Sequence, residues 1–261
     1  MNRLRALASF LSGAVIGTLG GLIGLGGAEF RLPLLVGAFR FAVLDAVILN
    51  KAMSLVVVAA ALPFRAGAVP LGLVAANGTV IVNLLAGSLL GAWIGAGWAV
   101  RMDAARLHRV IALLLVLIAG VLLFGHGAVS SGGPPVGGLA LIAAGTAAGF
   151  AIGVVASILG VAGGELLIPT LVLLFGVDVK LAGSLSLAIS LPTMIAGFSR
   201  YARDRSLSVL ARNRGFVLLM AAGSLAGTFI GGRLLGVVPE SVLLPALSAI
   251  LLLSAAKMWR H

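Results

Sequence analysis

Apolar stretches of about 20 residues follow one another along nearly the whole chain, and each is long enough to cross a bilayer as a helix. Hydrophobic residues make up 61% of the 261 positions and charged residues only 10%, which is outside the range of water-soluble domains. In lipid, a helix satisfies its own backbone hydrogen bonds. The sequence therefore predicts an all-α polytopic membrane protein without a soluble domain.

A glycine-rich motif occurs twice. Glu165 follows Glu29 by 136 positions (165 − 29), and each glutamate lies between a glycine cluster and a proline: Gly24-Leu25-Gly26-Gly27-Ala28-Glu29-Phe30-Arg31-Leu32-Pro33, then Gly160-Val161-Ala162-Gly163-Gly164-Glu165-Leu166-Leu167-Ile168-Pro169. The same offset relates further positions, including Gly17 to Gly153 and Ser54 to Ser190. We therefore predict a first transmembrane repeat over 1–125, a linker over 126–136 and a second repeat over 137–261.

Each half contains five hydrophobic segments, which we place at 5–27, 31–42, 43–63, 72–98 and 107–125, and at 138–161, 164–176, 180–198, 214–235 and 240–257. The second segment of each half is too short to span comfortably. This predicts broken or re-entrant helices at the glycine-rich motifs.

The net charge of +11 is distributed as membrane topology requires. Arginines gather near the N-terminus, at Arg101–Arg109 and in the polar stretch Ser199–Arg214, so the positive-inside rule puts these regions and both termini in the cytoplasm. An odd number of crossings per half then makes the two repeats inverted in topology. The sequence has no basic face with interleaved aromatic residues, so we do not expect a nucleic-acid partner.

The glycine clusters permit a helix to break inside the membrane. The next segments would begin with free N–H groups and a partial positive charge, which suits an anion. This predicts a substrate site that includes Gly26, Gly27, Ala28, Gly163 and Gly164. The alternative is that these glycines only allow helices to pack closely, which we prefer for Gly87, Gly91 and Gly95 and their counterparts in the second half.

Glu29 and Glu165 are candidates for proton coupling, since an intramembrane carboxyl group can take up and release a proton. The alternative is that each glutamate caps the first turn of a short helix. Arg31 could pair with Glu29, whereas its counterpart Leu167 could not pair with Glu165. We therefore expect the two glutamates to have different roles.

Lys51 lies well inside the segment 43–63, where a lysine is costly unless it is paired or faces a polar cavity. A cavity-facing ammonium would attract an anion; the alternatives are snorkelling and a pair with Asp45. The repeat counterpart of Lys51 is Leu187, and the surrounding segment offers hydroxyl groups instead. We predict that Lys51 binds the substrate together with Ser184, Ser186 and Ser190.

The sequence lacks the residues that metal binding or catalysis would require. The chain has no cysteine, and its three histidines lack the spacing of metal ligands. No catalytic constellation is visible, so we expect neither an enzyme nor a protein with a metal or cofactor.

The doubled motif, at the same place in two tandem halves, resembles the TauE/SafE (sulfite exporter) family of membrane permeases over essentially the full length. The resemblance implies export of a small sulfur oxyanion or organosulfonate, such as sulfite or sulfoacetate, across the bacterial cytoplasmic membrane, with protons as the suspected coupling ion. The chain departs from the commonest family pattern by its glutamate after the glycines and by Asn50-Lys51.

Two alternatives to a proton-coupled exporter stay open at this point. One is a passive anion channel, and the other is a membrane scaffold that recruits soluble partners through the basic stretch Arg200–Arg214. The partners we expect are a small anion, protons and the lipid bilayer. Further copies of the chain, in a homo-oligomer, are an additional partner that stays open.

Overall fold

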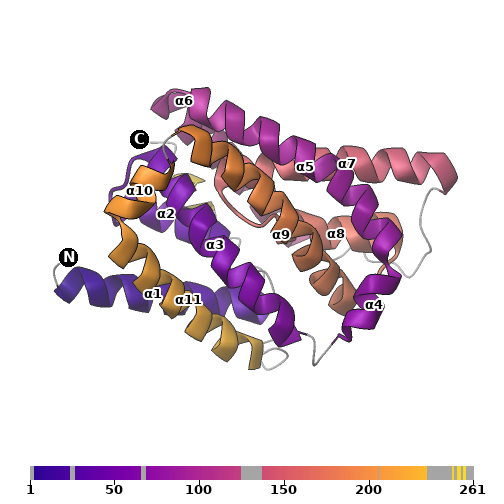
Figure 1. The fold of residues 1–261 in the computed structure, drawn as a ribbon, viewed down its shortest axis with the longest axis horizontal. Helices are drawn as coiled ribbons and strands as arrows, with labels where there is room; N and C mark the ends of the chain where they lie inside the picture. The colour runs from indigo at the N-terminus through magenta and orange to yellow at the C-terminus, as the bar shows by residue number, and fades with distance from the viewer. Residues whose placement is uncertain are drawn as a thin grey trace.

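A computed structural model describes residues 3–23, 27–65, 69–124, 137–204, 206–233, 249, 252–253 and 255–256. All regular elements in this part of the chain are helices (Figure 1), which confirms the predicted all-α class. They are α1 (Arg3–Ile23), α2 (Ala28–Gly37), α3 (Val43–Arg65), α4 (Leu71–Ala76), α5 (Gly78–Arg101), α6 (Ala104–Phe124), α7 (Gly138–Leu159), α8 (Gly164–Phe175), α9 (Val179–Asp204), α10 (Ser206–Arg212) and α11 (Arg214–Arg233). The predicted linker 126–136 and most of the predicted last segment 240–257 lie outside the described residues.

The length and the surface of these helices match a membrane protein. In the described ranges, α3, α5, α7, α9 and α11 each contain a stretch that is long and apolar enough to cross a membrane. Large apolar side chains are exposed on the outside, for example Leu139 at 81% and Leu218 at 69%, whereas Glu29, Arg31 and Lys51 are fully buried. This is the reverse of a water-soluble protein, where such charged residues almost never lie in the core, and it fits a surface that faces lipid.

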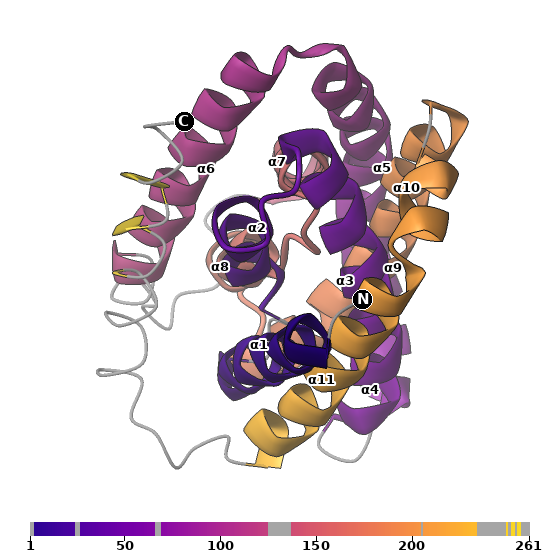
Figure 2. The same cartoon turned by 90° about the vertical axis from the view of Figure 1, so that its left-hand side faces the viewer.

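Two glycine-rich turns interrupt the apolar helices. Gly27, directly before α2, has φ 66°; Gly160, after α7, has φ 67°; and Gly163, before α8, has φ 80°. All three lie in the left-handed region that favours glycine. The helices that follow contain 10 and 12 residues, which is too short to cross the hydrocarbon core. Figure 2 shows α2 in front of α8, and Figure 1 shows them displaced horizontally, so the two short helices are arranged end to end.

Glycine-lined contacts join helices of different halves. Helix α1 packs along α11, and α5 packs along α7. A Cβ atom on any of the contact glycines would meet backbone atoms of the facing helix, so only glycine permits this approach. These glycines are Gly13, Gly17, Gly223 and Gly227 in the first pair, and Gly87, Gly91, Gly95, Gly149 and Gly153 in the second. The close-packing interpretation of Gly87, Gly91 and Gly95 is therefore confirmed.

The two contacts correspond to each other through the repeat. At an offset of 136 residues, α1 and α11 of one contact match α7 and α5 of the other. Individual contacts correspond as well: Gly17 meets Ser224 as Gly153 meets Ser88. The orientation of the halves relative to the bilayer stays a prediction.

Two regions differ from the elements expected from the sequence. The expected segment 72–98 is divided at Asn77 into α4 and α5. The stretch Ser199–Arg214, which we expected to be a polar loop, is helical at all its described residues except Asn213, because α9 continues to Asp204 and α10 follows. The stretch 199–214 contains neither glycine nor proline, so its residues are compatible with helices despite their polarity.

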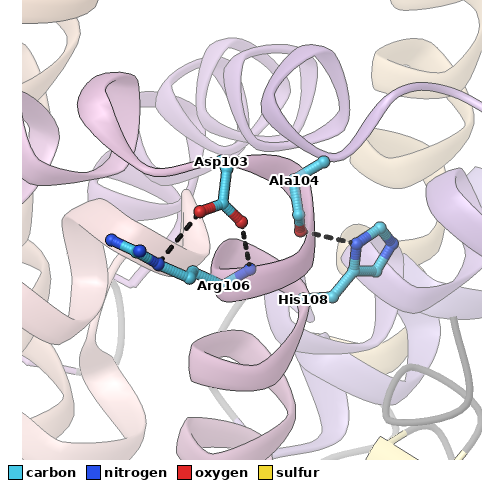
Figure 3. A network of polar contacts seen from close by, with 4 residues as sticks. All are labelled: Asp103, Ala104, Arg106 and His108. Atoms are coloured by element: carbon cyan, nitrogen blue, oxygen red, sulfur yellow. Dashed lines mark hydrogen bonds and ion pairs between the residues drawn. The ribbon is translucent and has the colours of Figure 1, made fainter.

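The arginine-rich turn between α5 and α6 is held by local contacts (Figure 3). Asp103 accepts a hydrogen bond from the backbone N–H of Arg106 at 2.8 Å and pairs with its side chain at 2.9 Å. His108 Nδ1 contacts the carbonyl oxygen of Ala104, one turn away, at 2.8 Å. These side chains serve the start of α6, and the described residues contain no cluster suited to a metal ion.

The glycine contacts can be tested by paired substitutions. We expect Gly153→Ala to lower the melting temperature of the detergent-solubilised protein, because the new Cβ would collide with the backbone of Ser88 and overpacking costs about 1–3 kcal/mol. Gly120→Ala is the matched control in a helix, since open space surrounds Gly120. There we expect no loss, because alanine favours a helix by about 0.5–1 kcal/mol over glycine. Equal melting temperatures for the two variants would contradict the close contact.

Candidate functional site

The two broken regions bring Glu29 and Glu165 together. Each glutamate is the second residue of its short helix, and each is at most 1% exposed. Their carboxyl groups lie close enough to repel each other when both are charged. The end-to-end arrangement of α2 and α8 in Figures 1 and 2 therefore joins the helices at their N-terminal ends.

The two carboxyl groups are buried close to each other, and no other described residue donates a hydrogen bond to them. In the described part of the chain, six buried side-chain nitrogen or oxygen atoms have no hydrogen bond from or to another residue. Five of these atoms are the four carboxyl oxygens of Glu29 and Glu165 and the Nε atom of Arg31. The carboxyl group of Glu165 forms no capping hydrogen bond, whereas that of Glu29 interacts with its own backbone N–H. Folded proteins pair the large majority of their buried polar atoms, so such a concentration at one place indicates a functional site.

Arg31 is buried among neutral acceptors. Its Nη1 atom donates to Asn50 Oδ1 at 3.3 Å and to Ser54 Oγ at 3.2 Å, and its Nη2 atom donates to Ser224 Oγ at 3.1 Å. The guanidinium is attracted by Glu29, but the direct ion pair we considered does not form, since Arg31 donates no hydrogen bond to either oxygen of that glutamate. Its positive charge is thus solvated by an amide and two hydroxyl groups.

Asn50 connects the two breaks. Its Nδ2 atom donates to the carbonyl oxygen of Ala28 at 2.9 Å and to that of Leu159 at 3.3 Å. Ala28 begins α2, and Leu159 ends α7. A single amide side chain thus supplies hydrogen bonds to backbone at both interruptions, where lipid could supply none.

Lys51 occupies a separate buried position. Its Nζ atom donates to Ser157 Oγ at 3.1 Å, and that hydroxyl donates to the carbonyl oxygen of Ala92 at 2.8 Å. Gly197 leaves the space that the ammonium fills, because a Cβ there would lie 2.9 Å from Nζ. The side chain is 0% exposed, and the ion pair found among the described residues joins Asp103 and Arg106, not Lys51 and Asp45. Snorkelling and the pair with Asp45 are therefore both wrong.

The three predicted serines have different surroundings. Ser190 donates to the carbonyl oxygen of Ala162 in the second break, at 2.7 Å. Ser186 donates to Gly183 within its own helix, at 2.9 Å. Ser184 is buried, and its hydroxyl has no partner among the described residues. Gly27, Ala28, Gly163 and Gly164 lie at the starts of the two short helices, whereas Gly26 lies outside the described residues.

The structure adds residues that sequence reasoning did not place in the site. Arg31 was considered only as a partner of Glu29, and Asn50 only as a neighbour of Lys51. Ser54 and Ser224 both have serine counterparts at the repeat offset, Ser190 and Ser88, which was the available signal. Ser157 carried no signal, since its contact with Lys51 spans 106 residues.

Apolar helices interrupted around buried charged groups define a polytopic membrane protein of the kind that moves solutes. The sulfite exporter TauE/SafE family model matches residues 1–122 and 145–261. The chain therefore belongs to the sulfite exporter TauE/SafE family, a family of membrane transporters, as its sequence motifs predicted. No curated protein and no solved structure shows a significant match to the chain.

The role of Asn50 can be tested by stability. We expect Asn50→Ala to lower the melting temperature strongly, because two carbonyl oxygens and Arg31 each lose a hydrogen bond and every buried group left unpaired costs about 1–3 kcal/mol. Asn77→Ala is the control, since Asn77 bonds only Leu73 in the preceding turn. A loss no larger than that of the control would show that the amide does not support the breaks.

Proposed function

We propose that the protein is a proton-coupled secondary transporter that exports a small anion, either sulfite or an organosulfonate such as sulfoacetate. One observation carries the proposal: two buried carboxyl groups, to which no other described residue donates a hydrogen bond, face each other at the junction of two broken helices, beside a buried arginine. The family supplies the class of substrate.

The carboxyl pair suits proton coupling. Two carboxylates that face each other in a dry interior repel, and a proton shared between them relieves the repulsion. Uptake or release of that proton changes the charge next to Arg31, whose attraction to Glu29 is already part of the site. The binding of a negatively charged substrate and the binding of a proton would thus both change the net charge around Arg31 and the two glutamates. Glu29 and Glu165 are the proposed coupling residues.

The anion would bind to positively charged side chains that are not already paired with a carboxylate. Arg31 and Lys51 donate hydrogen bonds only to neutral acceptors in the described structure, and an oxyanion forms stronger, charge-assisted bonds with such donors. The helix starts at Gly27–Ala28 and Gly163–Gly164 add N–H groups and the positive end of a helix dipole. The hydroxyls of Ser184, Ser186 and Ser190 are further proposed ligands.

Transport would follow from relative movement of the two halves. Inverted repeats with broken helices permit alternating access to a site between them. In this proposal the protein lies in the bacterial cytoplasmic membrane with both termini in the cytoplasm, as the arginine distribution favours.

Coupling can be tested in proteoliposomes loaded with sulfite under an imposed pH gradient. We expect the parent protein to move sulfite against its concentration gradient. Glu29→Gln and Glu165→Gln should retain downhill flux and lose most of the uphill component, because an amide cannot exchange a proton. Asp103→Asn is the control for a carboxylate at an exposed turn.

Two results would contradict the coupling proposal. If both glutamine variants keep the pH dependence of the parent, the glutamates are structural. If the parent itself moves sulfite only downhill and independently of pH, the protein is a passive anion channel.

Anion binding can be tested at Lys51. Charge-assisted hydrogen bonds contribute about 1.5–3 kcal/mol, so we expect Lys51→Gln to weaken sulfite binding by at least about tenfold. Arg109→Gln removes the same charge from an exposed position on α6 and should bind sulfite as the parent does. Isothermal titration of the purified proteins measures both. Equal affinities for Lys51→Gln and the parent would exclude the lysine from the site.

A further inference from the structure

A cavity of about 350 Å³ lies between α3, α5, α9 and α10. Asp45 and Ile48 line it from α3, Val100 from α5, Tyr201 from α9 and Arg212 from α10. Arg212 is exposed and Asp45 is half-buried, whereas Tyr201 is only 1% exposed. The cavity therefore extends from the surface to a buried tyrosine. Since a water molecule occupies about 30 Å³ of liquid, the volume suffices for a small hydrated ion.

Tyr201 and Lys51 are linked through Ser157. The tyrosine hydroxyl donates to the backbone carbonyl of Ser157 at 2.9 Å, and the side chain of the same serine accepts from Lys51 Nζ at 3.1 Å. Both hydrogen bonds are therefore made to the same residue, Ser157. Tyr201 lines the cavity, whereas neither Ser157 nor Lys51 does.

The helix faces continue from the cavity to the lysine. On α3, Leu44 and Ile48 line the cavity and Lys51 follows three residues later. On α9, Gly197 lies one turn before Tyr201 and leaves the space for Nζ. Residues three or four apart share one face of a helix. Each helix therefore presents one continuous face that begins at the cavity and ends at the buried charge.

We propose that this cavity is the vestibule through which a small oxyanion reaches Lys51, and that Tyr201 is the gate between them. Asp45 and Arg212 give the vestibule charges of both signs, so selection for an anion occurs behind the gate, at the ammonium. Opening requires the loss of the bond from Tyr201 to Ser157 and rotation of the ring. The inference rests on the proposed anion transport, and it adds a path and a gating residue to it.

The absence of cysteine from the sequence allows a test by single-cysteine labelling. Leu44→Cys reports on the vestibule, and Ser157→Cys reports on the position behind the gate. Proteoliposomes are treated with a membrane-impermeant, sulfonate-bearing methanethiosulfonate reagent or its trimethylammonium analogue. Rates are corrected for the reaction of each reagent with a free thiol.

We expect Leu44→Cys, at a half-buried position of the vestibule, to react readily from the face that carries Arg212, and Ser157→Cys to react slowly. In a Tyr201→Ala background the rate at Ser157→Cys should rise at least roughly fivefold, the factor that one lost hydrogen bond brings. The sulfonate reagent should react there faster than the cationic one, because of Lys51. Tyr201→Phe, which keeps the ring, should raise the rate less than Tyr201→Ala.

Phe216→Ala is the matched control for loss of a buried ring. Phe216 lies in the same hydrophobic cluster as Tyr201 and packs on Phe39 and Phe41 at centroid distances of 4.8 and 5.0 Å, but does not line the cavity. It should leave the rate at Ser157→Cys unchanged. Size-exclusion profiles show that each variant remains folded.

Three results would overturn the inference. Leu44→Cys could be unreactive from either face, Ser157→Cys could react equally fast with and without the tyrosine ring, or the cationic reagent could react faster behind the gate. Labelling needs no transported substrate, so the result does not depend on sulfite flux. A protein that moves no sulfite but shows the expected labelling contradicts the proposed function and retains the gate.

Discussion

The hydrogen-bonding demand of the interrupted backbone is the constraint on which the rest of the structure depends. Lipid offers no partner for a free N–H or carbonyl group, so a helix can stop at Gly27 or Gly160 only inside protein. The paired helices α1–α11 and α5–α7 approach closely through their glycines. Asn50 then bonds to carbonyl oxygens at both breaks. The interruption is thus supported by close helix packing and by one amide side chain.

Burial of the breaks inside protein also explains why the charged groups there have neither water nor a direct counter-charge around them. Burial removes water from Glu29, Glu165, Arg31 and Lys51, and a buried charge without a direct counter-charge is costly. A structure selected only for stability would replace these residues with apolar ones, as the second half does at Leu167 and Leu187. The presence of Arg31 and Lys51 in the first half, and of a glutamate in both halves, indicates that the cost is balanced by function.

The sequence was sufficient to predict the elements that depend on local composition. Apolar length located most membrane helices, and the repeated glycines located both breaks, because left-handed backbone and broken helices have direct sequence signals. The contacts of the site could not be predicted in the same way. Arg31 reaches Ser224 across 193 residues and Lys51 reaches Ser157 across 106, and no periodicity specifies such partners. The helical stretch from Ser199 was missed because its polarity was mistaken for a loop signal.

The partners of the two buried cations also show where movement would act. Arg31 and Lys51 belong to the first half, yet Ser224 and Ser157, which accept hydrogen bonds from them, belong to the second. Any displacement of one half relative to the other must stretch these bonds. Each is a bond to a neutral hydroxyl, which is weaker than a charge-assisted bond to an oxyanion. An arriving anion could therefore replace the serines as the partner of both cations and release one half from the other. Substrate binding and relative movement would then use the same atoms, which is the requirement for coupling them.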